Sequence, residues 1–439
     1  MTTTNIKIID ELKTFITAIK EEKKFFSSEK DFSKDRKLPF ERTVYLLMNM
    51  LKKSLSIELN EFFETIEQPD KCCSKSAFSQ QRQKLHYQFF AWWNVILVNS
   101  FYHHYKSKIK RWKGYRLIAV DGSTQYLINQ PEVLDYFGTQ VNQSVSVVMG
   151  RIVSAYDVLN EITISSQLHP ITCSEQRVAQ NWIPYYESDM LFLYDRGYPG
   201  FATIYLHLHQ EKEIKFVIRC KENFSKQVTA FVKSKTSSKI ITMKPSCNAV
   251  KELKKHGYII TPETFIKVRL VKVKLDNGTI EILMTNLYHE QHYPLTIFKE
   301  LYFKRWAVET NYNIQKNILQ LESFSGHKVN TILQDFYASI FIGNLQSIIS
   351  KQCEKKITDN TRHRKYRYKI NRNVAIGLMK NRVVKLFITK EIKELLLELE
   401  KLFLRHLEPI RPNRKYQRIT IHKRLKGKYQ TWTNYKRAI

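Results

Sequence analysis

Apolar side chains recur at helical spacing in the N-terminal part of the chain. Residues 89–105 form an aromatic-rich run, and within residues 41–51 the apolar positions fall at steps of three and four: Val44, Leu47, Met48 and Leu51. Such steps place the side chains on one face of an α-helix. The pattern therefore predicts a helical N-terminal domain over residues 1–112.

From Tyr115 onward the pattern changes to short apolar runs bounded by polar residues and glycine. Such runs predict buried β-strands. The predicted strands are residues 115–120, 145–154, 162–168, 190–194 and 214–219, with predicted helices over residues 174–186 and 201–210. This order predicts a mixed α/β core, whose first part covers residues 113–225.

Alternating apolar and polar positions then interrupt the core. Over residues 226–293 they predict a β-rich insertion. A helix that begins near Leu295 and a very apolar helix over residues 332–350 follow the insertion. We predict that these two helices complete the core over residues 294–352.

Positive charge is concentrated toward the C-terminus. The last 89 residues hold 26 Lys or Arg against 7 Asp or Glu, a difference of +19 out of the net +31 of the whole chain. An amphipathic helix is predicted over residues 391–406, between basic runs at 362–372 and 411–428. We predict that residues 353–439 form a basic, mainly helical region that contacts DNA, a second copy of the chain, or both.

Chain length, net charge and cysteine content indicate which partners and which cellular compartment to expect. At 439 residues the chain exceeds one ordinary core, and its pI of about 9.7 indicates a field that attracts polyanions. Nucleic acid is the leading partner. An anionic membrane surface is the second possibility, but no run of about 18 apolar residues and no apolar leader is present. Six scattered cysteines indicate neither a zinc site nor disulfides, and they favour a reducing, cytoplasmic compartment.

Residues 74–85 have the polar composition of a DNA-reading helix. Ser74 and Ser76 are N-cap residues, and the following Gln and Arg side chains have the donors that reach base edges or phosphates. A helical bundle with an ordinary polar face explains the same composition. For this segment both interpretations stay open from the sequence, and the helical domain of residues 1–112 as a whole is predicted to bind DNA.

Two carboxylates directly follow apolar strands. Asp121 precedes Gly122 at the predicted end of one strand, and Asp195 follows residues 190–194 in the same way. Ligands collect at the carboxyl ends of parallel strands, although either Asp alone is also a common turn or N-cap residue.

A third carboxylate lies on the helix that begins near Leu295. At about 100° per residue, Tyr302, Arg305, Glu309 and Lys316 fall within an arc of roughly 60° on one face. Taken alone, this stripe describes a solvated face with one Arg–Glu pair. Together with the two Asp residues, Glu309 makes a set suited to two divalent cations in phosphoryl transfer.

These residues resemble the DDE transposases of bacterial insertion sequences, specifically the insertion sequence four branch. Its Tyr-x2-Arg-x3-Glu-x6-Lys signature is matched by the stripe, its strand–Asp–Gly motif by Asp121 and Gly122, and its Asp-x-Gly-(Phe or Tyr)-x2-Phe motif by Asp195, Gly197, Tyr198 and Phe201. The resemblance covers about residues 115–337. It implies an RNase H-like core with Asp121, Asp195 and Glu309 as the catalytic and metal-binding triad. Two Mg²⁺ ions per site are expected, with Mn²⁺ as a substitute.

The resemblance also implies contacts to DNA. The expected DNA-binding residues are Tyr302, Arg305, Trp306, Lys316, Arg219 and Lys221. For Trp306, a place beside a flipped base and a place in the core are both open. The implied function is cut-and-paste DNA transposition on terminal inverted repeats and target DNA, by a homodimer associated with the bacterial nucleoid. A catalytically inactive DNA-binding protein and a nuclease or resolvase without strand transfer are the alternatives.

Overall fold

The computed structural model describes residues 1–34, 36–142 and 145–411, and these residues form two compact units. Of the described residues, unit 1 contains those within 1–108, 126–149 and 313–411, and unit 2 contains 109–125 and 150–312. Each unit is therefore built from stretches that are far apart in the sequence. Of the predicted basic run 411–428, all but Arg411 lies outside the described residues.

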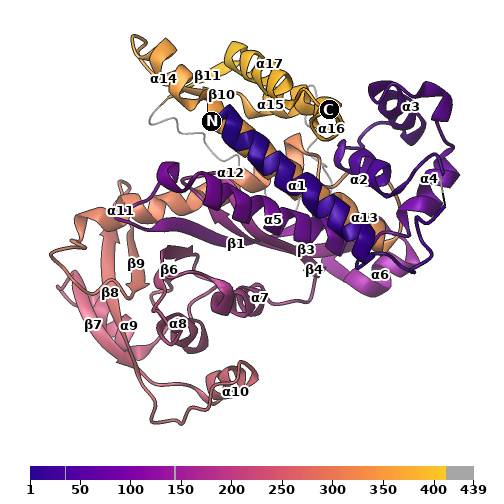
Figure 1. Cartoon of the computed structure of the whole chain (residues 1–439). Helices are drawn as coiled ribbons and strands as arrows, with labels where there is room; N and C mark the ends of the chain where they lie inside the picture. Colours follow the sequence, from indigo (N-terminus) through magenta and orange to yellow (C-terminus); the bar gives the residue numbers. More distant parts are fainter. Residues whose placement is uncertain (35, 143–144, 412–439) are drawn as a thin grey trace. The chain divides into compact units, whose positions relative to one another are not determined.

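Unit 1 is almost entirely helical, as the periodicity predicts. Its long helices α1, α5 and α13 run side by side (Figure 1). The stacked rings of Trp93 and Phe341, whose centroids are 4.0 Å apart, join α5 to α13. The elements of this unit are α1 (Thr2–Glu22), α2 (Phe40–Met48), α3 (Leu55–Thr65), α4 (Lys75–Arg82), α5 (Gln88–His104), α6 (Pro131–Phe137), β2 (Thr139–Asn142), α13 (Val329–Ser350), α14 (Glu354–Thr361), β10 (Arg367–Ile370), α15 (Arg372–Met379), α16 (Arg382–Ile388), α17 (Ile392–Arg405) and β11 (Leu407–Ile410).

Helix α4 is the segment in which a DNA-reading helix was one interpretation, and two of its polar side chains face inward. Arg82 is buried, and its guanidinium donates to Gln334 and pairs with Asp335 at 2.9 Å. Gln81 is also buried and donates to the backbone carbonyl of Leu38. Gln81 and Arg82 therefore belong to the interior of unit 1 and not to a DNA-reading surface. They face inward because each is held by fixed acceptors.

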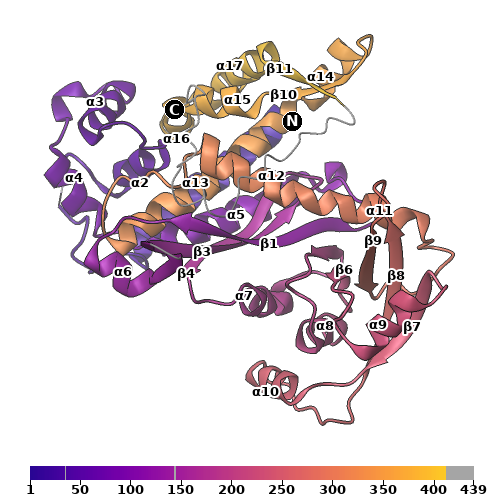
Figure 2. The same cartoon turned by 180° about the vertical axis from the view of Figure 1, so that it is seen from behind.

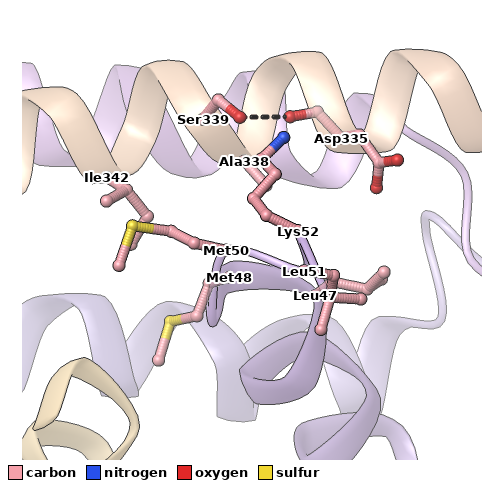
Figure 3. Close-up of a pocket in the computed structure, with 9 residues that line it drawn as sticks. All are labelled: Leu47, Met48, Met50, Leu51, Lys52, Asp335, Ala338, Ser339 and Ile342. Carbon is pink, nitrogen blue, oxygen red and sulfur yellow. Dashed lines mark hydrogen bonds between the residues drawn. The ribbon is translucent and has the colours of Figure 1, made fainter. Parts of the chain in front are cut away.

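A small cavity lies in unit 1 where the chain leaves α2 and meets α13 (Figure 3). Its volume is about 10 Å³, room for no more than about one water molecule, so it is a packing void and not a ligand site. Lys52 lines it and donates to the carbonyls of Gln320 and Ser323. Burial lowers the pKa of Lys52 to about 8, although the nearby Asp335 carboxylate opposes that shift.

Unit 2 is built on one large mixed sheet. The strand order is β2-β3-β1-β5-β6-β9-β8-β7, and β4 pairs with β3. β1 pairs with β5 and β5 with β6 in parallel, whereas β6, β9, β8 and β7 pair with one another in antiparallel fashion. The strands are β1 (Arg116–Tyr126), β3 (Val145–Asp157), β4 (Ile162–Pro170), β5 (Met190–Tyr194), β6 (Lys215–Cys220), β7 (Ser238–Met243), β8 (Ile266–Lys274) and β9 (Ile280–Thr285). β3 starts in unit 1, where its first residues pair with β2.

Helices cover both faces of this sheet, which explains the continuous apolar runs of its parallel strands. Leu191 and Leu193 of β5 pack with α11 on one face, whereas Phe192 and Tyr194 pack with α7 and α8 on the other (Figures 1 and 2). The helices are α7 (Glu175–Trp182), α8 (Phe201–Leu208), α9 (Lys226–Lys233), α10 (Cys247–Lys255), α11 (Thr296–Phe303) and α12 (Ala307–Asn313).

The predicted mixed α/β class is confirmed, and the architecture is consistent with an RNase H-like core. Three details differ from the sequence prediction. β1 does not end at Asp121 but continues to Tyr126, α6 and β2 were not predicted, and the insertion holds α9 and α10 besides its strands. Within the described part of the chain, no helix is long and apolar enough to cross a membrane.

Candidate active site

The pairing of two parallel strands places Asp121 beside Asp195. In the register of β1 and β5, Val120 lies opposite Tyr194, and each Asp is the next residue along its chain. Neighbouring strands are about 4.8 Å apart, so the two carboxylates start from adjacent backbone positions. Asp195 therefore follows the end of β5 as the sequence predicted, whereas Asp121 lies within β1, directly after the apolar residues that pair with β5.

Arg305 brings Glu309 to the same place. The helical stretch continues from α11 through a 3₁₀ turn (Lys304–Trp306) into α12, and Arg305 is only 3% exposed. Its Nη2 donates to Glu309 Oε1 at 2.8 Å, and its Nη1 lies 3.6 Å from Asp121 Oδ2. One buried guanidinium thus bridges the carboxylates of β1 and α12.

Asp195 is held from two sides. Tyr302 donates its hydroxyl to the carbonyl of Tyr194 at 3.2 Å, and the same hydroxyl lies 3.5 Å from Asp195 Oδ1. Arg219 of β6 lies 3.9 Å from Asp195 and 3.1 Å from Glu281, so it stands between two carboxylates.

The electrostatics show that the three carboxylates act on one another. Burial raises the pKa of Asp121 to about 6, against the opposing effects of Arg305 and of the Gly122 N–H. Glu309 and Asp195 raise this pKa further by repulsion. The repulsion of Asp121 by Glu309 and Asp195 therefore favours the binding of a cation among the three carboxylates.

Comparison with known proteins identifies the family. A family model described as "Transposase DDE domain" matches residues 98–345, which is more than half of the 439-residue chain and includes all three carboxylates. The chain belongs to the transposase DDE domain family. It is thus a transposase, an enzyme of DNA transposition, as the sequence motifs predicted.

Two other comparisons add little to this identification. The chain is similar to the solved structure titled "Cryo-EM structure of piggyBac transposase synaptic complex with hairpin DNA", at 11% identity over 90% of this chain and 82% of that chain. The TM-score is 0.40, and a similarity at that level does not support a conclusion about the fold or function of this chain. No curated protein matches the sequence.

The donor set of the transposase fits a divalent cation in its chemistry. Among residues 1–34, 36–142 and 145–411, no three Asp, Glu, His or Cys side chains lie close enough together to enclose a metal ion. The carboxylates of Asp121, Asp195 and Glu309 are, however, the oxygen ligands that Mg²⁺ prefers, and their mutual repulsion favours a cation. In the present arrangement Arg305 supplies the positive charge beside Asp121 and Glu309.

Two further residues that the sequence did not single out support the backbone at Asp121. Tyr312 donates its hydroxyl to the carbonyl of Asp121 at 2.7 Å. Glu175, in the first turn of α7, pairs with Arg151 and lies against Gly122, where an added Cβ would be 2.0 Å from the Glu175 carboxyl carbon. A side chain at position 122 would therefore have to displace the Glu175 carboxylate. Glu175 lies in the first turn of the helix predicted over residues 174–186, and nothing in the local sequence pattern indicates its contact with Gly122.

The remaining predicted DNA-binding residues differ in their surroundings. Trp306 is 38% exposed, so the alternative of a core position is wrong, and the Arg305 guanidinium lies 5.1 Å from its ring centroid. Lys221 is exposed just after β6. Lys316 belongs to unit 1, half-buried in a π-helical turn (Ile314–Ile318). Because of the 3₁₀ and π turns, the regular 100° spacing used to place Lys316 on the stripe does not hold.

Proposed function

We propose that this transposase belongs to the insertion sequence four branch and performs cut-and-paste transposition. It binds the terminal inverted repeats of its element as a homodimer, cleaves them, and joins the freed 3′ hydroxyl to target DNA. The observation that carries the proposal is the convergence of Asp121, Asp195 and Glu309 around one buried guanidinium within the family-matched residues. The branch assignment rests on the Tyr302, Arg305, Glu309 and Lys316 spacing.

In the proposed site, Asp121, Asp195 and Glu309 hold two Mg²⁺ ions, for which Mn²⁺ substitutes. When bound, such ions activate the attacking oxygen and stabilise the leaving oxygen of a phosphodiester. The protein's own part is positioning. Tyr312 fixes the backbone of Asp121, and Tyr302 braces the end of β5 at Asp195.

Arg305 is the proposed contact to the scissile phosphate. Its Nε and Nη1 are buried and make no hydrogen bond within the described part of the chain, although Nη1 lies near Asp121. Buried donors without acceptors are costly, and a phosphate oxygen would satisfy them with charge-assisted hydrogen bonds. Arg219, Lys221, Trp306 and Lys316 are proposed as further DNA contacts, and Tyr302 contacts DNA only if its hydroxyl leaves Tyr194.

The test is cleavage of labelled duplex DNA that carries the element's ends, which the inverted repeats flanking the reading frame supply. The wild type should nick the ends in Mg²⁺ and form joined products. Replacing Asp121, Asp195 or Glu309 with Ala should abolish nicking and leave end binding intact. Glu300→Ala is a matched control, because Glu300 lies on α11 with its side chain 80% exposed.

Each alternative outcome identifies a different protein. Binding without nicking by the wild type would indicate a non-catalytic DNA-binding protein, and nicking without joined products would indicate a nuclease or resolvase. Undiminished nicking by any of the three triad variants would contradict the site assignment.

A further inference from the structure

Unit 1 contains a basic cleft between α4 and the segment that leads into α2. Its volume is about 680 Å³. Figure 1 shows α2, α3 and α4 gathered in one part of this unit. The cleft is lined by Arg36, Lys37, Leu38, Pro39, Arg42, Lys71, Cys73, Ala77, Gln80, Gln81 and Lys84.

Five of the described residues that line this basic cleft are cationic, and none of those described is acidic. The contacts found for Lys37 and Arg42 are to neutral groups: Lys37 donates to the carbonyl of Cys72, and Arg42 donates to Gln68 and to a backbone carbonyl. Among the described residues only Lys84 of the five forms an ion pair, with Asp31 at 3.9 Å. The positive charge of the cleft is therefore largely uncompensated and is available to an anionic ligand.

The α4 wall of the cleft is firmly anchored. Ser74 caps α4 by accepting from Ala77 N, and the buried Arg82 ties its last turn to Asp335 of α13. Gln81 connects α4 to Leu38 across the cleft. The exposed residues of α4 are Lys75, Ser76, Ala77, Ser79 and Gln80, of which Ala77 and Gln80 also line the cleft.

We propose that this basic cleft binds the sugar–phosphate backbone of duplex DNA, with the exposed side of α4 turned toward the bases. Lys and Arg side chains spread over several segments suit successive phosphates, and phosphate contacts fix the register of a reading helix. No aromatic side chain lines the cleft, so a single nucleotide would find no ring on which to stack its base. This inference rests on the proposed function, because it takes DNA as the substrate. It assigns a second DNA-binding surface to unit 1, whereas the three carboxylates belong to unit 2.

The test compares binding of fluorescent end DNA, measured by anisotropy without divalent metal so that cleavage does not interfere. Arg36→Ala with Lys71→Ala removes two lining charges for which no ion pair is found among the described residues. Affinity at about 0.15 M salt should fall roughly tenfold or more, and the slope of log K against log salt should decrease by about two. The control, Lys7→Ala with Lys106→Ala, removes two exposed charges elsewhere in unit 1 and should change affinity by less than about twofold.

A second readout does not depend on substitution. Cys73 lines the cleft, whereas Cys247 is exposed in unit 2. Bound end DNA should slow alkylation of Cys73 much more than alkylation of Cys247. This measurement also separates a lost contact from a misfolded variant, since it uses the wild-type chain.

The outcomes distinguish this inference from the proposed function. Wild-type affinity and salt slope in the Arg36/Lys71 variant, or unchanged Cys73 alkylation in the presence of bound DNA, would overturn the cleft as a binding site while leaving transposition intact. Failure of the wild type to bind any end DNA would overturn both. Loss of affinity together with protection of Cys73 would support the cleft even if the triad variants still cleaved.

Discussion

Arg305 holds a single positive charge, nearly inaccessible to solvent, among three carboxylates that repel one another. It makes one good hydrogen bond, to Glu309, and leaves two of its donor nitrogens unused within the described residues. An arrangement that leaves buried donors without acceptors costs stability, and such costs are typically found at functional sites. The residue is thus both a counter-charge for the carboxylates and a ready donor for a phosphate.

Asp121 shows the cost of assembling this site. Its pKa is raised to about 6, mainly by burial, so above pH 6 the folded protein holds an ion that water solvates better in the unfolded chain. Between about pH 4 and 6 the folded state binds more protons than the unfolded state. The contribution of Asp121 to the free energy of unfolding therefore falls as the pH rises through this range.

Asp121→Asn should therefore stabilise the metal-free protein above pH 6, by roughly 1–3 kcal/mol. The gain should shrink as the pH falls from 6 and disappear below the ordinary Asp pKa of about 3.9, where Asp121 is protonated in both states. Urea unfolding of the variant and the wild type at several pH values measures this difference in the free energy of unfolding. A variant that is less stable than the wild type at pH 8 would contradict the pKa shift and its cause.

Gly122 offers a second test at the residue scale. In Gly122→Ala the new Cβ must displace the Glu175 carboxylate and so break its pair with Arg151, which should lower both stability and cleavage. Glu175→Ala removes the carboxylate that the new Cβ would otherwise meet. The two substitutions should be non-additive by about 1 kcal/mol or more in a double-mutant cycle of unfolding free energy. Simple additivity would show that Gly122 and Glu175 do not constrain one another.

At this scale the sequence located the three carboxylates and Arg305, because strand ends and helical spacing are local properties. It did not locate Glu175, Arg151 or Tyr312. Glu175 lies against Gly122, 53 positions earlier (175 minus 122), Arg151 pairs with Glu175, 24 positions later, and Tyr312 bonds to Asp121 across 191 positions. Local patterns carry no information about such pairs.

Helix α4 illustrates what decides the role of an element. Its sequence has the polar composition of a DNA-reading helix, but tertiary packing assigns Arg82 and Gln81 to the interior and leaves Gln80 at the cleft. The periodicity was informative for α5, α13 and α17 because each of them buries a broad apolar surface. It was uninformative for α9 and α10, which are short helices within a segment of alternating strands.

Arg82→Ala tests this assignment. Removing one partner of a buried pair leaves Asp335 without its counter-charge, and we expect unit 1 to lose about 3–5 kcal/mol of stability. Gln80→Ala, one of the exposed positions of the same helix, should leave thermal stability within about 0.5 kcal/mol and weaken discrimination between end DNA and random DNA. An Arg82→Ala protein of normal stability would contradict the buried-pair role.

At the scale of the whole molecule, the described chain separates into two units with different tasks in the proposed function. Unit 2 carries the three carboxylates on one mixed sheet and the helix beside it, and unit 1 carries the basic cleft. The composition predicted the polyanion partner, since a net charge of +31 is a property of the whole chain. It did not predict that each unit is formed from separate stretches, because that division depends on tertiary contacts alone.

The central claim is that Asp121, Asp195 and Glu309 hold the catalytic metal ions, and a change of ligand at Asp195 tests it most directly. Mg²⁺ demands oxygen ligands, whereas Mn²⁺ accepts a sulfur ligand more readily. End cleavage by Asp195→Cys should be lost in Mg²⁺ and return at least in part in Mn²⁺, while Glu300→Cys should cleave in both. Cleavage by Asp195→Cys in Mg²⁺ at the wild-type rate would contradict the claim.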